Sequence, residues 1–122
     1  MKKHAVFISV PMSEKTDAEI KESIQKAKKA YLAITERDIS NVAFVDNTDV
    51  INLANEEMEP EHLRVWYLGH ALTKLSTCDE AFFWLGWGKA RGCMIEYEVC
   101  SIYDIPTLSV NHGPVCEFRI RG

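Results

Sequence analysis

The sequence lacks any apolar run that approaches the ~18–20 residues of a bilayer-spanning helix, although apolar residues make up 47% of its 122 positions. Its early apolar stretch, Ala5 to Pro11, is short for a secretory signal and has no convincing cleavage site. Basic side chains are also few: 14 Lys and Arg face 18 Asp and Glu, a net charge of −4 that argues against a general nucleic-acid binder. Because this length suits one domain, we expect a single cytoplasmic domain over residues 1–122 with no membrane or nucleic-acid partner.

Motifs for metals and nucleotide cofactors are missing as well. The four cysteines form no C-x-x-C pair, and the four histidines form no H-E-x-x-H motif, so a zinc site has little support. Neither a dinucleotide fingerprint nor a P-loop follows the first apolar run. We therefore expect buried free thiols rather than disulfides, no metal site and no cofactor.

Short apolar runs alternate with amphipathic helical patterns along the chain. The runs predict strands at 4–10, 41–45, 80–85 and 106–110, with 115–120 as a candidate fifth strand. The helical patterns begin near Asp17, Glu61 and Arg91. This alternation favours a three-layer α/β/α fold with a mostly parallel sheet of four to five strands, of the flavodoxin or Rossmann-like kind. The segment 46–60 has no clear pattern and is expected to be a long irregular loop.

In an open parallel sheet, ligands bind at the carboxyl ends of the strands. The residues expected at those ends include Ser9, Pro11, Met12, Asp46 and His112. Serines and aspartates are also ordinary turn residues, so turn chemistry is an equal alternative for Ser9 and an adequate one for Asp46. His112 is a candidate general acid by position alone.

The segment from Gly86 to Glu96 carries the most specific pattern. Glycines let the backbone turn sharply and approach a ligand, and Gly92 stands where a helix is expected to begin. Glu96, one turn later, would be kept ionised by the helix dipole and would face the crevice. A charged carboxylate there suits nucleophilic attack in retaining glycosyl transfer. The alternative is that an acidic residue near a helix start only stabilises the helix.

Several short motifs resemble those of the nucleoside 2-deoxyribosyltransferase-like family. They are Val6-Phe7-Ile8-Ser9-x-Pro11, Leu75-x-x-Cys78-Asp79, and Leu85-Gly86-Trp87-x-x-Ala90-x-Gly92-x-x-x-Glu96. The resemblance implies that Glu96 attacks C1′ of a deoxyribose, that Ser9 to Met12 line the base and sugar, and that the protein is a homo-oligomer. It also implies that Arg64 holds a phosphate or a base carbonyl; an ion pair with Glu61 or Asp46 is the alternative.

One position departs from the family pattern. Six residues before the glutamate the family places an aspartate or a serine, whereas this chain has Ala90. Lys89 and Arg91 flank it and would restore an anion site, or are solvated loop charges. Trp87 offers a face for base stacking, with a wall residue of the sheet edge as the alternative.

The sequence thus predicts an enzyme that cleaves the N-glycosidic bond of a small nucleoside or nucleotide and passes the sugar to a base or to water. The alternative is a protein that binds a nucleotide in the same crevice without turning it over. Ala90 favours that second interpretation.

Overall fold

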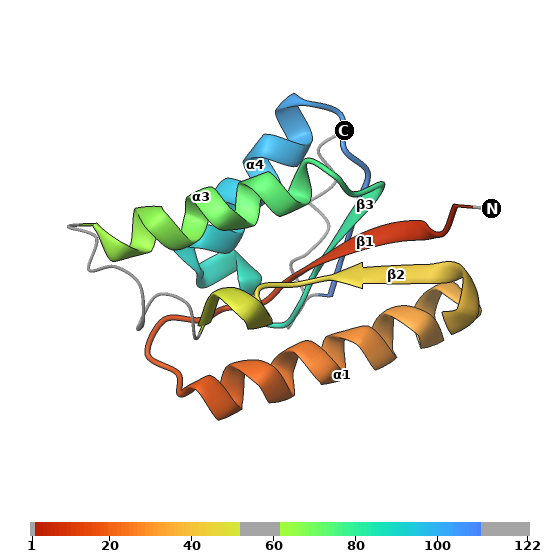
Figure 1. The fold of residues 1–122 in the computed structure, drawn as a ribbon, viewed down its shortest axis with the longest axis horizontal. Helices are drawn as coiled ribbons and strands as arrows, with labels where there is room; N and C mark the ends of the chain where they lie inside the picture. The colour runs from red at the N-terminus through yellow and green to blue at the C-terminus, as the bar shows by residue number, and fades with distance from the viewer. Residues whose placement is uncertain (1, 52–61, 111–122) are drawn as a thin grey trace.

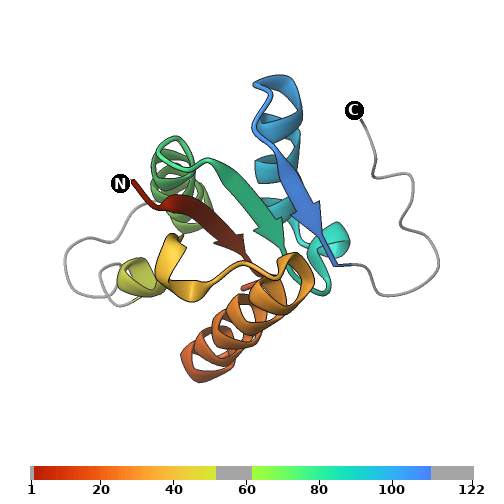
Figure 2. The same cartoon turned by 90° about the vertical axis from the view of Figure 1, so that its right-hand side faces the viewer.

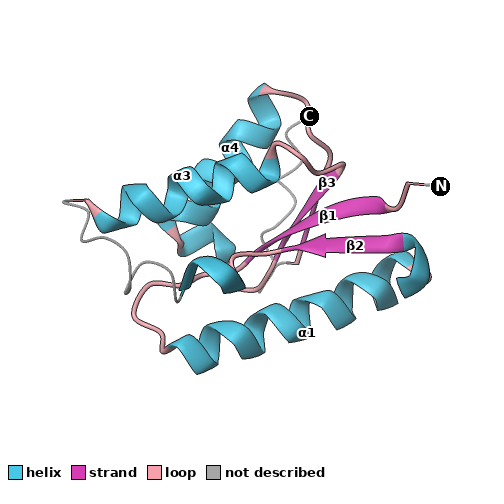
Figure 3. Ribbon diagram, viewed as in Figure 1, coloured by secondary structure: helices cyan, strands magenta, loops and turns pink. Residues whose placement is uncertain are grey.

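A four-stranded parallel sheet forms the centre of the protein. The computed structural model describes residues 2–51 and 62–110. The sheet has the order β2-β1-β3-β4 and every neighbouring pair is parallel, as the arrows in Figure 3 show. Its strands are His4–Ser9 (β1), Val42–Val45 (β2), Glu80–Phe83 (β3) and Thr107–Ser109 (β4). The predicted α/β class is confirmed, and the fifth strand expected at 115–120 lies outside the described residues.

Among the elements in the described residues, the helices α1, α3 and α4 cover the two faces of this sheet. Helix α1 (Asp17–Thr35) lies on one face, and α3 (Leu63–Leu75) and α4 (Arg91–Ile102) lie on the other (Figures 1 and 2). Two short 3-10 helices, η1 (Ile39–Asn41) and η2 (Trp87–Lys89), precede β2 and α4. Among the helices in the described ranges, none combines the length and apolar character that crossing a bilayer needs.

The prediction of an irregular loop over residues 46–60 is wrong near the start of that segment. Residues 48–51 are helical. The Asp46 carboxylate accepts a hydrogen bond from the Thr48 backbone N–H at 2.9 Å, and the Asn47 carbonyl accepts from the Val50 N–H at 3.1 Å. Aspartate and asparagine suit turns, and they also accept hydrogen bonds from the free N–H groups at a helix start. The same residue types are therefore compatible with both structures.

Side chains of β1 and β3 alternate between two apolar cores. Val6, Ile8 and Phe82 pack with the buried face of α1 around Tyr31. Phe7, in between, belongs to the core under α3 and α4, which also contains Ala81, Phe83 and the Cys93 and Cys100 side chains of α4. Strands buried on both faces explain why these runs are continuously apolar.

The N-terminal cap of α1 gives a first testable prediction. Thr16 Oγ1 accepts from the Glu19 N–H at 3.1 Å and the Glu19 carboxylate accepts from the Thr16 N–H at 2.9 Å, a complete capping box. We expect Thr16→Ala to lower the free energy of unfolding by ~1 kcal/mol, measured by urea denaturation. Thr16→Ser keeps the hydroxyl and serves as the control; an equal loss in both variants would contradict the cap assignment.

The chain reverses its direction across the sheet between β1 and β3. From β1 it crosses through α1 to β2, and from β3 it crosses through α4 to β4 on the other side. The two crossover helices lie on opposite faces (Figure 2). Such a switch point leaves a crevice outside the carboxyl ends of the two central strands, where α/β proteins bind ligands.

Candidate functional site

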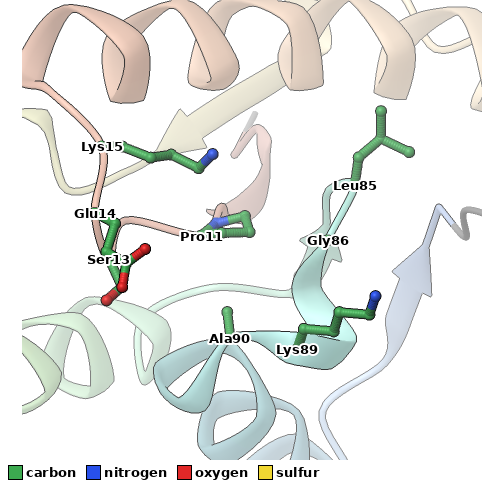
Figure 4. Close-up of a pocket in the computed structure, with 8 residues that line it drawn as sticks. All are labelled: Pro11, Ser13, Glu14, Lys15, Leu85, Gly86, Lys89 and Ala90. Carbon is green, nitrogen blue, oxygen red and sulfur yellow. The ribbon is translucent and has the colours of Figure 1, made fainter.

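A pocket of about 370 Å³ lies at this switch point. One wall is the loop that follows β1 and the other is the segment that follows β3 (Figure 4). Its size falls in the range of small-molecule sites. The lining residues are Pro11, Ser13, Glu14, Lys15, Leu85, Gly86, Lys89 and Ala90.

The carboxylate of Glu96 is buried next to the carboxyl end of β1. Glu96 belongs to α4 and only 6% of it is exposed. Ser9, the last residue of β1, is 2% exposed and its hydroxyl donates to Glu96 Oε1 at 2.6 Å. A short hydrogen bond to a carboxylate is among the stronger kinds. Ser9 therefore holds Glu96 in place from the neighbouring layer, as a positioning residue rather than a wall of the open pocket.

The electrostatic state of Glu96 corrects the sequence-based expectation. Helix α4 begins at Arg91, so Glu96 stands beyond the first turn, where the helix dipole has little effect. Burial raises the pKa of Glu96 from its ordinary 4.5 to about 7, and the hydrogen bond from Ser9 lowers it only in part. Near neutral pH this carboxyl is poised between its charged and neutral forms, which is typical of groups at functional sites.

The Ser9 contact makes a prediction about the acidity of Glu96. Removing the hydroxyl with Ser9→Ala is expected to raise the pKa of Glu96 further, because a hydrogen bond to a charged group contributes ~1.5–3 kcal/mol. NMR titration of the side-chain carboxyl carbon, assigned by its absence in Glu96→Gln, measures this. Ser13→Ala, at an exposed serine of the pocket, is the control. A midpoint that is unchanged or lower in Ser9→Ala would contradict the interpretation.

The structure brings part of the predicted site together. Pro11 and Lys89 line the pocket, and Ala90, the residue that departs from the family pattern, forms part of its wall. Arg91 and Gly92 are exposed in the first turn of α4, directly after Ala90. Figure 4 shows the Ala90 methyl group on the pocket side of that helix start.

The indole ring of Trp87 is not accessible for stacking with a nucleobase. It is 7% exposed, and its ring packs on Phe83 and Tyr97 with centroids 5.4 and 4.8 Å away. The wall-residue alternative is therefore the one that the structure favours. The surrounding glycines indicated a loop, but η2 turns the indole inward onto the core under α4.

Three other predicted residues lie away from the pocket lining, and a fourth falls outside the described residues. Met12 packs against the core under α1. Asp46 forms an ion pair with Lys28 at 3.0 Å and accepts a hydrogen bond from the Thr48 N–H. These structural contacts account for the Asp46 carboxylate, and its ion-pair partner is Lys28 rather than Arg64. Arg64 is exposed in the first turn of α3, and His112 lies outside the described residues.

Five lining residues were not among those predicted to bind substrate: Ser13, Glu14, Lys15, Leu85 and Gly86. Two of them have left-handed backbones, Glu14 with φ 62° and Gly86 with φ 85°. Non-glycine residues in this region are uncommon and concentrate at functional loops. Proximity to the carboxyl end of β1 was the available signal for Ser13, Glu14 and Lys15, but the stretch expected to line the substrate was Ser9 to Met12.

The thiols near Glu96 are not candidate nucleophiles. Cys93 and Cys100 are buried and free, as predicted. Burial, reinforced by the negative charge of Glu96, raises the pKa of both to about 12, so they stay neutral thiols. Within residues 2–51 and 62–110, no three His, Cys, Asp or Glu side chains are grouped so that they could hold a metal ion.

The site thus consists of a pocket at the switch point and, at the carboxyl end of β1, a buried carboxyl of raised pKa. Comparison of the chain with protein-family models, curated proteins and solved structures gives no match.

Proposed function

We propose that this protein cleaves the N-glycosidic bond of a deoxynucleoside or deoxynucleotide, with Glu96 as the nucleophile. The observation that carries the proposal is the Ser9–Glu96 pair, 2.6 Å apart and buried at the carboxyl end of β1. The pocket at the same strand end supplies room for a substrate. We also propose that the protein is a homo-oligomer, as the family resemblance implies, and that it is cytoplasmic.

The chemistry follows from the contacts of the carboxylate. Ser9 occupies Oε1 of Glu96, so Oε2 is the oxygen that attacks C1′ of the sugar. The bond from C1′ to the base nitrogen breaks as the ester bond forms, and the base leaves with the electron pair and takes a proton from water. Water or a second base then attacks C1′ and releases a proton to the solvent, which balances the proton taken by the leaving base, and the ester oxygen returns to Glu96 as a carboxylate.

The raised pKa of Glu96 suits this role. A carboxylate that is poorly solvated gains more when it forms an ester than one that is stabilised by water, because burial penalises its charge. At pH values above about 7 most molecules carry the ionised form. The nucleophile is therefore available in the neutral to weakly alkaline range.

A second candidate is a protein that binds a nucleotide without turnover. The observations that favour it are the low exposure of Glu96, 6%, and the methyl group of Ala90 in the pocket wall in place of a polar side chain. In that case neutralising Glu96 would leave binding of an anionic ligand unchanged or improve it, whereas catalysis requires the charged form.

The test is an incubation of the protein with deoxynucleosides and their 5′-monophosphates, with and without a free acceptor base, followed by chromatography. Release of base supports a hydrolase, and exchange of base supports a transferase. If no base is released but the same compounds raise the melting temperature, the binding protein replaces the enzyme. Absence of both effects would reject both candidates.

A further inference from the structure

The outer side of α4 carries apolar side chains that face away from the sheet. Met94, Ile95 and Ile102 are 44%, 40% and 63% exposed, whereas the opposite side of the helix packs Cys93 and Cys100 into the core under α4. The helix is therefore apolar on two sides. This pattern is typical of a helix that is covered on both sides rather than one that borders water.

The layer that contains α4 holds most of the exposed apolar side chains among the described residues. Helices α3 and α4 lie side by side on one face of the sheet (Figures 1 and 2). Exposed apolar patches on such a layer mark surfaces that bind another protein. The large apolar residues that are exposed on α3, on α4 and directly after α4 are Leu63, Val65, Met94, Ile95, Ile102 and Tyr103.

Four residues form a line along the outer side of α4. Arg91, Ile95, Glu98 and Ile102 follow one another at intervals of four, three and four residues, and all four are exposed. Residues with this spacing share one side of a helix, and the same spacing forms the seam of paired helices. The line thus combines apolar side chains with a positive charge in the first turn and a negative charge about two turns later.

The order of the two charges makes this line complementary to itself. In a two-fold dimer, when residue i contacts residue j of the second copy, j also contacts i of the second copy. Arg91 and Glu98 are equally far along the sequence from the point between Met94 and Ile95. An antiparallel pair of α4 helices centred on that point therefore brings Arg91 of each copy to Glu98 of the other. A parallel pair would instead bring like charges together.

The charged groups are suited to such contacts. Within residues 2–51 and 62–110, Arg91 makes none of the ion pairs that His4 and three lysines make. A guanidinium is the cation best suited to pair with a carboxylate at an interface. The Glu98 carboxylate has two oxygens, so it can accept from Arg91 of a second copy in addition to its interaction within the chain.

We infer that the outer side of α4 binds a second copy of this chain. The two α4 helices pair antiparallel, with Met94 and Ile95 at the centre and two reciprocal Arg91–Glu98 ion pairs around it. This inference rests on the homo-oligomer of the proposed function and names its surface, but it does not depend on the reaction. Because Glu96 lies on the buried side of α4, assembly and base release can be measured separately.

Analytical ultracentrifugation over a concentration series tests the pairing with charge reversals. We expect wild type to dimerise, and Arg91→Glu and Glu98→Arg each to raise the dissociation constant of the dimer at least about tenfold. The reason is that symmetry turns both ion pairs into like-charge contacts. An equimolar mixture of the two single variants should form a mixed dimer, and the double variant a homodimer, because both restore the opposite charges. Lys29→Glu, an exposed reversal on α1 at the other face of the sheet, should leave the dimer unchanged.

The outcomes separate the surface from the rest of the proposed function, once urea denaturation has shown that each variant is folded. A wild-type dimer that every variant retains would overturn the surface and leave the homo-oligomer standing. A monomeric wild type would overturn both, with a different protein as the occupant of this side of α4. Weakened single variants that recover neither in the mixture nor in the double variant would reject the antiparallel pairing. Absence of base release from a protein that forms this dimer would reject the proposed reaction and support the surface.

Discussion

Replacement of Glu96 by glutamine is expected to abolish base release, with a fall in kcat/KM of at least ~10³-fold. The amide keeps nearly the same shape and can still accept the hydrogen bond that Ser9 donates at 2.6 Å. It cannot form the ester bond to C1′, because it carries no anionic oxygen. The change therefore removes the nucleophile while the contacts around it remain, and chromatographic assay of base release measures the effect.

The pH profile and a neighbouring glutamate sharpen this prediction. Since attack needs the ionised form, activity should rise with pH through the pKa of Glu96 at about 7 and level off above it. Glu98→Gln, at an exposed position two residues further along α4, should keep full activity. Equal losses in both variants, or activity that is greatest near pH 5, would exclude Glu96 as an anionic nucleophile.

The parallel sheet could be predicted because its strands are buried on both faces. Runs such as Glu80–Phe83 contain consecutive apolar residues, and the intervening segments have helical spacing, so the order of elements follows from local pattern. The helical turn at 48–51 was missed because cap residues and turn residues are the same amino acids.

The position of the candidate carboxylate was predictable, but its chemistry was not. The spacing from Gly92 to Glu96 is visible in the sequence, whereas the pKa depends on burial and on Ser9, which is 87 residues away along the chain. Long-range contacts of this kind have no local signal. The same reason applies to Trp87, whose environment is set by Phe83 and Tyr97.

The lining of the pocket shows a second limit of prediction from the sequence. Lys89 was singled out because it flanks Ala90, but its counterpart Lys15 comes from a different loop. The two are brought to one pocket only when β1 and β3 pair in parallel. Neither lysine is unusual in the sequence, so their common place in the pocket lining depends on topology rather than on a motif.

The same Glu96→Gln variant is expected to be more stable than wild type above pH 7. Burial raises the pKa of Glu96 from 4.5 to about 7, so the folded state holds the proton more tightly than the unfolded chain does. The stability linked to this proton is fully present below pH 4.5 and is lost as the pH rises through 7. At ~1.36 kcal/mol per pKa unit, the loss amounts to about 3 kcal/mol by pH 8.

Glutamine cannot ionise, so its stability lacks this pH dependence. Urea denaturation should show the two proteins within ~1 kcal/mol at pH 4 and the variant ahead by about 3 kcal/mol at pH 8. A difference that is constant with pH, or a variant that is less stable at pH 8, would mean that the carboxylate is not penalised by burial. A variant that gains stability while it loses base release would show that the inactivity does not come from unfolding. It would also show that the fold carries a destabilising charge at its functional site, which is the trade-off expected of a catalytic group.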